Sequence, residues 1–383
     1  MHTKIWSPIA ALVATSMLFG GSALAMSHTI KIGVIQPLTG PLAFNGNNDV
    51  NGAKLAVKEI NARGGVLGKK IELVVEDGQC KPADSVNAAE KLIVRDKVPA
   101  IMGAFCSGAT AAVIPVAERY KVPLVTGVSS NPKLTEVLHP WFFRNAETEL
   151  MTAQAFAGIL YEKRGMKKIY YLAVNDDWGR GSVTAFSEVF KKLGATNVGV
   201  EYINRAANDF YTPLTKIRAK NPDVMVVVAE TQAGSIIAKQ AKELGLKTKI
   251  FGVGAWATPT FMNLAGDAGN GLLAGVVYTS TMKSDRNKAF VARFKKAYNE
   301  LPGKYSAAGY NSINIIAQAI ERAGAAEPAK IRDALEKTDY LAPNGHIRFD
   351  SKHQAYGLEL VLVELRNKVP VVLATGVIKS PND

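Results

Sequence analysis

Short apolar runs alternate with helical patterns along almost the whole chain from Thr29 onward. Compact apolar runs are typical of buried parallel strands, and apolar residues three or four positions apart are typical of helices that pack on a sheet. Their regular alternation predicts βαβ units and a mostly parallel sheet. In the first part of the chain the expected strands are 30–35, 71–75, 100–102, 124–125 and 142–144, and the expected helices are 50–62, 83–94 and 109–120.

A second round of the same alternation begins near Glu149. Its expected helices are 150–163, 182–193, 211–220 and 233–244, and its expected strands are 168–174, 198–203, 223–228 and 249–252. A strand over 275–279, helices over 287–299 and 307–323, and a strand over 358–365 follow. A chain of 383 residues exceeds what one hydrophobic core usually serves.

We therefore predict an α/β fold of two Rossmann-like lobes with parallel-rich sheets. Lobe 1 is expected to comprise residues 26–147 and 279–350, and lobe 2 residues 148–278 and 351–383. Because the chain returns late to complete earlier sheets, several crossings between the lobes would form a hinge. A ligand would then bind in the cleft between the lobes.

The first 25 residues have the pattern of a secretory signal peptide. Lys4 precedes an apolar stretch over 9–19, and small residues ending Ala23-Leu24-Ala25 provide an A-x-A cleavage site. No later apolar run reaches the roughly 18 residues of a membrane anchor. The first cysteine is Cys80, so no lipid anchor is expected near the cleavage point. We expect a soluble mature protein that begins at Met26 and resides outside the cytoplasm.

The formal net charge of +13 falls to +12 when Lys4 is removed with the signal peptide. Such a balance could indicate a nucleic-acid partner, but the charges are dispersed and the export signal argues against nucleic acid. A solvated basic surface is the simpler interpretation. Two cysteines and five scattered histidines are too few to predict a metal site.

Cys80 and Cys106 follow two strands that we expect to be neighbours, in a chain directed to an oxidising compartment. A disulfide between them is the leading prediction, and two buried free thiols are the alternative. Closing this loop would remove about 3–4 kcal/mol of unfolded-state entropy in the loop-closure model.

Two strand-to-helix turns carry the densest set of small polar groups in the chain. The first is Gly103-Ala104-Phe105-Cys106-Ser107-Gly108-Ala109-Thr110, and the second is Thr126-Gly127-Val128-Ser129-Ser130-Asn131-Pro132. Each lies at the carboxyl end of an expected buried strand, where open α/β sheets bind their ligands. Free N–H groups and the helix dipole favour an anion there. Ser107 and Ser130 could thus bind a carboxylate, and helix capping is the alternative role for each.

We expect no enzymatic activity and no cofactor. Ser107 lacks the Gly-x-Ser-x-Gly elbow, and the chain contains no Gly-x-x-x-x-Gly-Lys-Ser/Thr phosphate loop. Gly252-Val253-Gly254 lacks the third glycine of a dinucleotide fingerprint. His139, His346 and His353 stand in loop-like contexts without a recognisable catalytic partner.

An ordered set of motifs over nearly the whole mature chain resembles the branched-chain amino acid (Leu/Ile/Val) periplasmic binding proteins, type I solute-binding proteins of ABC importers. The motifs are Ile32-Gly33-Val34 with Leu38-Thr39-Gly40-Pro41, Gly52-Ala53 through Glu59-Ile60-Asn61, Gly64-Gly65-Val66-Leu67-Gly68, Asp77 with Cys80, Cys106-Ser107, and Asn131-Pro132-Lys133-Leu134-Thr135. The resemblance implies three hinge crossings, closure around a small ligand and delivery to an ABC permease in the inner membrane. It also supports the Cys80–Cys106 pairing and implies a monomer.

The resemblance further implies how the ligand is bound. Ser107, Ser130 and the backbone of Val128 match the groups that hold an amino acid's carboxylate in the family. The family's ammonium-binding glutamate falls on Gly254, so the chain departs from the pattern there. Glu230, at the neighbouring strand end, either takes over an ammonium or binds a hydroxyl or amide.

The walls of the expected site also differ from the family pattern. The aromatic lid of the first loop falls on Asn45, whereas Trp178 and Tyr305 match aromatic wall positions. Phe105 is expected to add an apolar wall, and Trp256 is a further candidate. For Trp178 the alternative is that it covers the core of its own lobe.

Together these features predict a periplasmic solute-binding protein of an ABC transporter, which closes on a small carboxylate such as an amino acid or an aromatic acid. A ligand-sensing receptor coupled to a membrane sensor is the alternative function. The same fold serves both roles.

Overall fold

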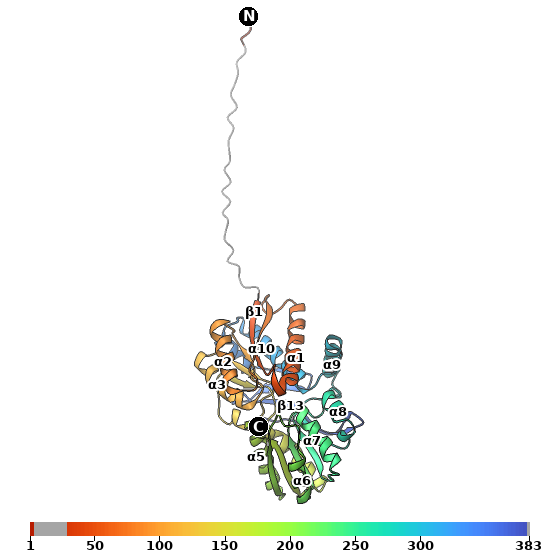
Figure 1. Ribbon diagram of the computed structural model, residues 1–383. Coiled ribbons are helices and arrows are strands. Elements are labelled where there is room, and N and C mark those ends of the chain that lie inside the picture. The colour runs from red at the N-terminus through yellow and green to blue at the C-terminus, as the bar shows by residue number, and fades with distance from the viewer. Residues whose placement is uncertain (4–28, 381–383) are drawn as a thin grey trace.

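The computed structural model describes residues 1–3 and 29–380, which form two α/β lobes, one above the other in Figure 1. The predicted two-lobe architecture is confirmed. Except for its first three residues, the predicted signal peptide lies outside the described residues. Strand β13 (Ala355–Arg366) lies between the labelled helices of the upper and lower lobes in Figure 1.

Lobe 1 is built on a five-stranded parallel sheet with the order β2-β1-β3-β4-β5. In the register of this sheet, Val34 lies opposite both Val75 and Met102. Val34 and Met102 are buried, so the apolar runs form the core as the sequence pattern predicts. The strands are β1 (Thr29–Gln36), β2 (Lys70–Asp77), β3 (Ile101–Met102), β4 (Leu124–Thr126) and β5 (Phe142–Arg144).

Helices from two distant parts of the chain cover this sheet. They are α1 (Ala43–Ala62), α2 (Pro82–Glu90) and α3 (Ser107–Tyr120), followed much later by α9 (Asp285–Tyr298), α10 (Lys304–Ala323) and α11 (Pro328–Leu335). Helices α1 and α10 pack at very short range. A Cβ atom on Gly52 would lie 1.9 Å from the carbonyl oxygen of Ser306, and one on Gly309 would lie 2.0 Å from that of Asp49. The two glycines therefore permit the close approach that returns the late helices to lobe 1.

Lobe 2 is built on a nine-stranded mixed sheet with the order β11-β12-β13-β10-β9-β8-β6-β7, and β14 pairs with β13. Pairings among β6 to β10 are parallel, whereas β11 to β14 pair antiparallel. The remaining strands are β6 (Lys168–Val174), β7 (Thr196–Ile203), β8 (Val224–Val228), β9 (Lys249–Val253), β10 (Leu273–Val276), β11 (Tyr340–Ala342), β12 (Gly345–Phe349) and β14 (Val369–Val377).

The helices of lobe 2 are α4 (Glu149–Gly158), α5 (Asp177–Lys192), α6 (Tyr211–Lys220), α7 (Thr231–Glu243) and α8 (Pro259–Ala265). Leu172, Val227 and Phe251 on the central strands are fully buried beneath this layer. Short 3₁₀ turns at Gly40–Leu42, Pro132–Thr135 and Gly266–Gly269, and π-helical turns at Lys91–Arg95 and Ile159–Lys163, complete the elements.

As the two sheets divide the chain, it passes between the lobes at three places, namely 145–148, 277–284 and 336–339. Arg144, fully buried at the first crossing, ties this crossing to the turn 350–354 between β12 and β13. Its Nε donates to Oε1 of Gln354 at 2.5 Å, and its Nη1 donates to the carbonyl oxygen of Asn131 at 2.6 Å. Burial lowers the pKa of Arg144 to about 10, and nearby carboxylates act against this shift. The first crossing and the β12–β13 turn are thus joined by a buried hydrogen-bond network.

Several expected elements differ in extent from those observed. The helix expected over 50–62 begins at Ala43, and the strand expected over 275–279 lies at Leu273–Val276. The sequence pattern did not lead us to α8, α11, β11, β12 or β14. The β11–β12 hairpin, which we placed in lobe 1, pairs with β13 of the second sheet. The lobe boundaries themselves stay a prediction.

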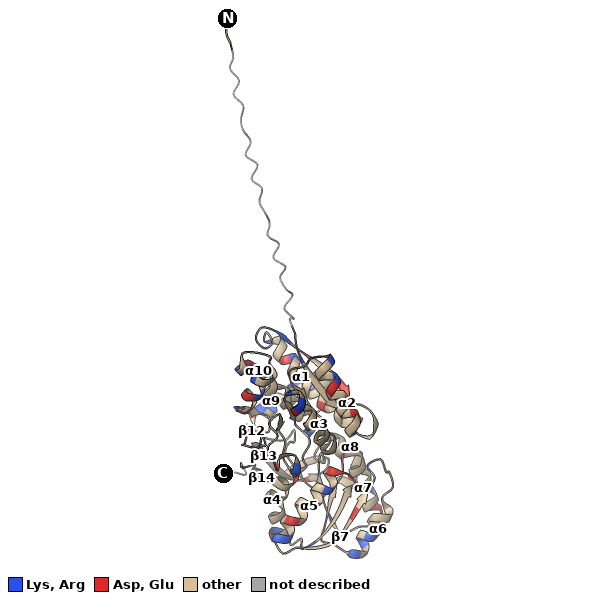
Figure 2. Ribbon diagram, turned by 90° about the vertical axis from the view of Figure 1, so that its left-hand side faces the viewer, with Lys and Arg blue, Asp and Glu red and all other residues tan. Residues whose placement is uncertain are grey.

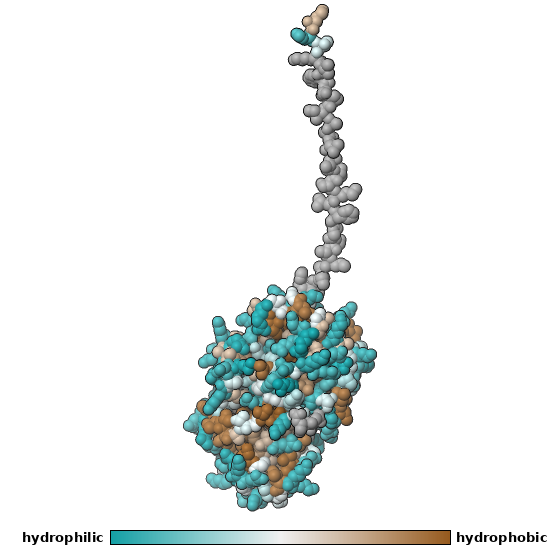
Figure 3. All heavy atoms as spheres, turned by 180° about the vertical axis from the view of Figure 1, so that it is seen from behind, coloured by the Kyte–Doolittle hydropathy of each residue, from teal (hydrophilic) through white to brown (hydrophobic). Residues whose placement is uncertain are grey.

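Charged residues occur on both lobes. Figure 2 shows basic and acidic residues spread over both lobes, in line with a solvated basic surface. On the face seen in Figure 3, hydrophobic residues gather in the lower half. In the described part of the chain, no helix combines the length and apolar character needed to cross a membrane.

Candidate functional site

A cavity lies between the lobes, at the carboxyl ends of strands from both sheets. Its small size restricts its occupant to a small molecule. Its lining comprises Phe105, Cys106, Ser107, Val128, Ser130, Trp178, Arg205, Glu230, Gly254, Lys304 and Tyr305. Eight of the ten residues that we predicted as ligand contacts are in this set.

The first wall is the turn between β3 and α3. Cys106 precedes the helix and Ser107 is its first residue, so the unpaired N–H groups of α3 begin at the cavity. The predicted disulfide is confirmed, since Cys80 and Cys106 are joined with a Cα–Cα distance of 5.4 Å. Phe105 has a left-handed backbone with φ of 71°, uncommon for a residue with a side chain. This wall is therefore held by a covalent link and a specialised turn.

The second wall is the turn that follows β4. Val128 and Ser130 line the cavity, and the backbone N–H of Asn131 donates to Oγ of Ser107 at 3.3 Å, which joins the two turns. The hydroxyl of Ser130 donates to Oε1 of Glu149 at 2.5 Å. In this conformation Ser130 is thus bound to a carboxylate of the protein itself.

Glu149, the first residue of α4, links two walls of the site through Ser130 and Trp178. Its Oε1 also accepts a hydrogen bond from Nε1 of Trp178 at 2.5 Å, and its Oε2 has no hydrogen-bond partner among the described residues. Burial raises the pKa of Glu149, and the hydrogen bonds from Ser130 and Trp178 act against this shift. A buried acceptor atom therefore remains free beside the cavity.

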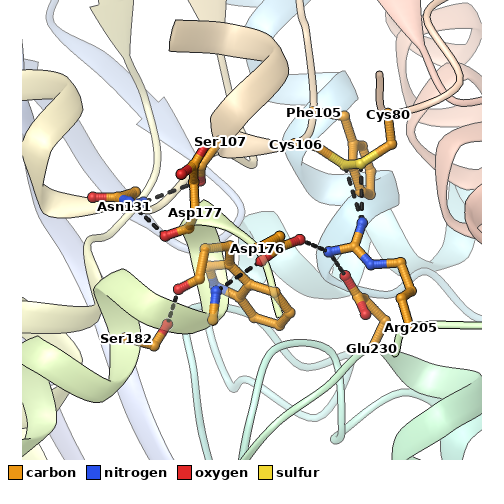
Figure 4. Close-up of polar contacts among 12 residues, drawn as sticks. Cys80, Phe105, Cys106, Ser107, Asn131, Asp176, Asp177, Ser182, Arg205 and Glu230 are labelled. Carbon is orange, nitrogen blue, oxygen red and sulfur yellow. Dashed lines mark hydrogen bonds and ion pairs between the residues drawn. A yellow bond between two sulfur atoms is a disulfide. The ribbon is translucent and has the colours of Figure 1, made fainter. Parts of the chain in front are cut away.

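Three adjacent strands of lobe 2 deliver charged groups to the cavity from their carboxyl ends. Asp176 follows β6, Arg205 follows β7 and Glu230 follows β8. The guanidinium of Arg205 forms an ion pair with Asp176 and another with Glu230, the latter with Nη2 and Oε1 2.8 Å apart. Its Nη1 points to the disulfide of lobe 1, at 3.0 Å from Sγ of Cys80 and 3.5 Å from Sγ of Cys106 (Figure 4).

Glu230 is buried and keeps one oxygen free. Its Oε2 has no hydrogen-bond partner within the part of the chain that the structure describes. Burial raises the pKa of Glu230, and Arg205 acts against this shift. Asp176, Arg205 and Glu230 carry together one net negative charge when all three are ionised.

A second buried cation, Lys304, begins α10. Its Nζ lies 2.6 Å from Oε1 of Glu147 in the first crossing between the lobes. The two side chains are each 7% exposed, so this ion pair is almost fully removed from water. Both cations at the cavity are therefore neutralised by protein carboxylates.

Aromatic rings complete the walls. The rings of Phe105 and Tyr305 meet with their centroids 5.0 Å apart, and burial raises the pKa of the Tyr305 hydroxyl. Gly254 has φ of +119°, and a Cβ placed on it would lie 3.5 Å from the Trp178 ring. The position where the family pattern has a glutamate is thus filled by an indole face.

Two predicted contacts lie elsewhere. Trp256 is 0% exposed, stacks on Phe261 with centroids 4.6 Å apart and donates through Nε1 to the carbonyl oxygen of Ala229 at 2.8 Å. We therefore correct its assignment, because it packs in the core of lobe 2 and does not line the cavity. Asn45 lines a neighbouring pocket that shares Tyr305 with the cavity.

Sequence reasoning missed Arg205, Lys304, Glu147, Glu149 and Asp176. Arg205 carries a signal in retrospect, since it directly follows a strand of the parallel sheet. Glu149 follows Thr148, whose hydroxyl caps α4, so it reads as an ordinary acidic residue in the first helical turn. Lys304 has the local pattern of a surface residue, and nothing nearby in sequence indicates its partner.

The arrangement offers hydrogen-bond donors at the start of α3, a free acceptor on Glu230, and aromatic walls between them. Such a site between two hinged lobes defines a binding protein for a small polar solute rather than a surface for a macromolecule. The family model described as "Periplasmic binding protein" matches residues 29–368. The chain belongs to this family.

Known relatives cover nearly the whole chain. The Pseudomonas aeruginosa leucine-, isoleucine-, valine-, threonine- and alanine-binding protein is 27% identical over 357 residues, which are 93% of this chain and 95% of that protein. The structure of the LivJ substrate-binding protein from Streptococcus pneumoniae, in complex with isoleucine, has a TM-score of 0.83 and 29% identity and covers 92% of this chain and 100% of its own.

A second kind of ligand occurs among similar structures. A solute-binding protein of an ABC transporter from Rhodopseudomonas palustris, in complex with 3,4-dihydroxybenzoic acid, has a TM-score of 0.85 and 28% identity. It covers 93% of this chain and 99% of its own. Relatives of comparable similarity thus bind an aliphatic amino acid or an aromatic acid, and both ligands carry a carboxylate.

Proposed function

We propose that this protein captures a small carboxylate in the periplasm and delivers it to an ABC permease in the inner membrane. The observation that carries the proposal is the Cys106–Ser107 turn, which presents the first residue of α3 to the interlobe cavity. Homologues that are transport binding proteins for amino acids and aromatic acids support it.

In the proposed complex the ligand carboxylate lies at the start of α3. The hydroxyl of Ser107 and the unpaired N–H groups of the first helical turn donate to it, and the positive end of the helix dipole favours its charge. Val128 supplies the adjoining wall. Ser130 adds a hydrogen bond only after its hydroxyl turns away from Glu149, so its contribution is smaller than that of Ser107.

The rest of the ligand lies between Phe105, Tyr305 and Trp178, which suit an aliphatic side chain or an aromatic ring. The hydrogen-bond donor of the ligand meets Glu230. Because Arg205 occupies only one oxygen of that carboxylate, the other can accept from an ammonium, an amide or a hydroxyl group. An amino acid and a hydroxylated aromatic acid both provide such a donor.

A ligand screen on the mature protein tests the proposal. Leucine, isoleucine, 4-hydroxybenzoate and 3,4-dihydroxybenzoate are added in a thermal-shift assay, each beside its carboxamide, which lacks the charged carboxylate. A ligand present at 100 times its Kd stabilises the folded state by about 2.7 kcal/mol. We expect at least one acid to raise the melting temperature and its amide to leave it unchanged. Equal shifts for acid and amide, or no shift with any small carboxylate, would contradict the proposal.

Two finer features belong to the same proposal. We infer that residues 1–25 are removed on export, which mass spectrometry of the periplasmic protein tests by a mature N-terminus at Met26. We also infer that the protein acts as a monomer, which light scattering of the purified protein measures. A dimeric mass in the presence of ligand would overturn the second inference.

A further inference from the structure

The side chain of Arg205 contacts both lobes at the same time. It is 18% exposed and belongs to lobe 2, where its Nη2 is paired with Glu230 and Asp176. Its Nη1 reaches across the cleft to the two sulfur atoms of the lobe 1 disulfide, as Figure 4 shows. Sulfur is a weak hydrogen-bond acceptor, but here two sulfurs face one charged donor.

The bridge made by Arg205 runs beside the proposed path of the ligand. In lobe 1 the disulfide cysteine Cys106 directly precedes Ser107, where the ligand carboxylate would bind. In lobe 2 Arg205 is paired with Oε1 of Glu230, and the ligand would bind the free Oε2 of the same carboxylate. A ligand and Arg205 would therefore draw the same two elements together.

Opening of the lobes would affect the two halves of this bridge differently. Arg205, Asp176 and Glu230 follow neighbouring strands of one sheet, so their ion pairs can persist when the lobes separate. The contacts with Cys80 and Cys106 join different lobes and must break. The guanidinium would thus stay held in place by its two carboxylates, ready to meet the disulfide when the lobes close.

We propose that Arg205 is a positioning residue for ligand capture, which latches lobe 2 onto the Cys80–Cys106 disulfide and holds Glu230 with one oxygen free for a hydrogen-bond donor of the ligand. The proposal rests on the proposed function for its ligand. It narrows the substrate class to small carboxylates that also carry a hydrogen-bond donor within reach of Glu230. A purely apolar acid would leave the free oxygen of Glu230 buried and unsatisfied, which is unfavourable.

The latch acts on the population of the closed state. A ligand that needs both lobes binds with an apparent Kd that rises as the closed fraction falls. Arg205→Gln removes the charge and the bridge, so we expect the Kd to rise about tenfold or more, mainly through faster dissociation. Arg205→Lys keeps one charge near Glu230 and cannot span to the sulfurs, so it should dissociate faster as well.

Two measurements test the proposal on the mature protein with its disulfide intact. Small-angle X-ray scattering gives the radius of gyration with and without ligand, and stopped-flow fluorescence gives the dissociation rate. The probes are two matched pairs that differ in the donor, leucine with 4-methylpentanoate and 4-hydroxybenzoate with benzoate. Arg218→Gln is the control, because the Arg218 guanidinium contacts the carbonyl oxygen of Leu244 within lobe 2 at 3.0 Å.

We expect the wild type and Arg218→Gln to prefer the donor-bearing member of at least one pair, and Arg205→Gln to lose most of that preference. Arg205→Gln should also have a larger radius of gyration. If Arg205→Gln has the same radius of gyration and the same dissociation rates as the wild type, the proposed role of Arg205 is overturned. If Arg205→Gln does not fold, the same two measurements are made on Arg205→Lys. If no member of either pair binds to the wild type, the ligand proposal fails. The radius of gyration of Arg205→Gln compared with that of the wild type still tests whether Arg205 holds the lobes together.

Discussion

Removal of the Lys304 ammonium should destabilise the protein strongly, because it leaves a buried carboxylate without its counter-charge. Lys304→Met keeps the length of the side chain and deletes the charge. The Glu147 Oε1 atom, now 2.6 Å from Nζ, would lose its partner, and its Oε2 has none among residues 29–380. Breaking a buried ion pair by removal of one partner costs about 3–5 kcal/mol.

The corresponding change in melting temperature follows from the size of the protein. An unfolding entropy of about 2.1 cal/mol/K per residue gives roughly 0.7 kcal/mol/K for a chain of about 350 residues. A loss of about 3–5 kcal/mol then lowers the melting temperature by about 4–7 °C. Differential scanning calorimetry measures this shift directly, and urea unfolding gives the free energy.

Two further variants show whether the effect arises from the buried charge. In Lys304→Met/Glu147→Gln both charges are gone, so most of the lost stability should return. Lys288→Met deletes an exposed ammonium 2.9 Å from Asp285 and should leave the melting temperature unchanged. A Lys304→Met protein as stable as the wild type, or a double variant as unstable as the single one, would refute the reasoning.

Four other changes have defined outcomes. Between pH 4.5 and its raised pKa, folded Glu149 binds more protons than unfolded Glu149, so its contribution to stability falls as the pH rises. When melting temperatures are measured over a series of pH values above 4.5, Glu149→Gln should therefore lose less stability than the wild type. Parallel curves for the two proteins would contradict this prediction. Trp256→Phe loses the bond to Ala229 and should cost about 1–2 kcal/mol in urea unfolding without changing ligand affinity, whereas weaker ligand binding would return Trp256 to the site. Trp178→Leu should weaken the binding of ligand, measured by calorimetric titration, and an unchanged Kd would place the indole outside the ligand's contacts. Gly52→Ala should lower the melting temperature by several degrees, because its Cβ would overlap the backbone of Ser306, and an unchanged value would show that α1 and α10 can separate.

Much of the fold could be predicted because it is local. The apolar run of β6 and the amphipathic pattern of α6 lie where the sequence places them. Strand β14 was missed although it is apolar, since Pro370 weakens the strand pattern and the strand pairs only at the sheet edge with β13. Helix α8 is too short to show a helical period.

For the candidate site, too, the residues in local patterns could be predicted and those that depend on distant partners could not. Ser107, Val128 and Ser130 could be found because each follows a recognisable strand, and strand ends are where such sheets bind ligands. Arg205 and Lys304 could not, because their roles depend on partners 125 and 157 residues away in the chain. The sequence shows charged residues, but it does not show which of them the fold pairs, and those pairs decide which oxygens of Glu230 and Glu149 stay free.

The most direct test of the account is a calorimetric titration of the acid identified in the screen, with the wild type, Ser107→Ala and Ser85→Ala. Ser85 is buried in lobe 1 outside the cavity and donates to the carbonyl oxygen of Gly78, so it controls for the loss of a buried hydroxyl. The account predicts that Ser107→Ala loses about 1–3 kcal/mol, or about 5- to 150-fold in Kd, and that Ser85→Ala binds like the wild type. An unchanged Kd in Ser107→Ala would contradict a carboxylate site at the start of α3.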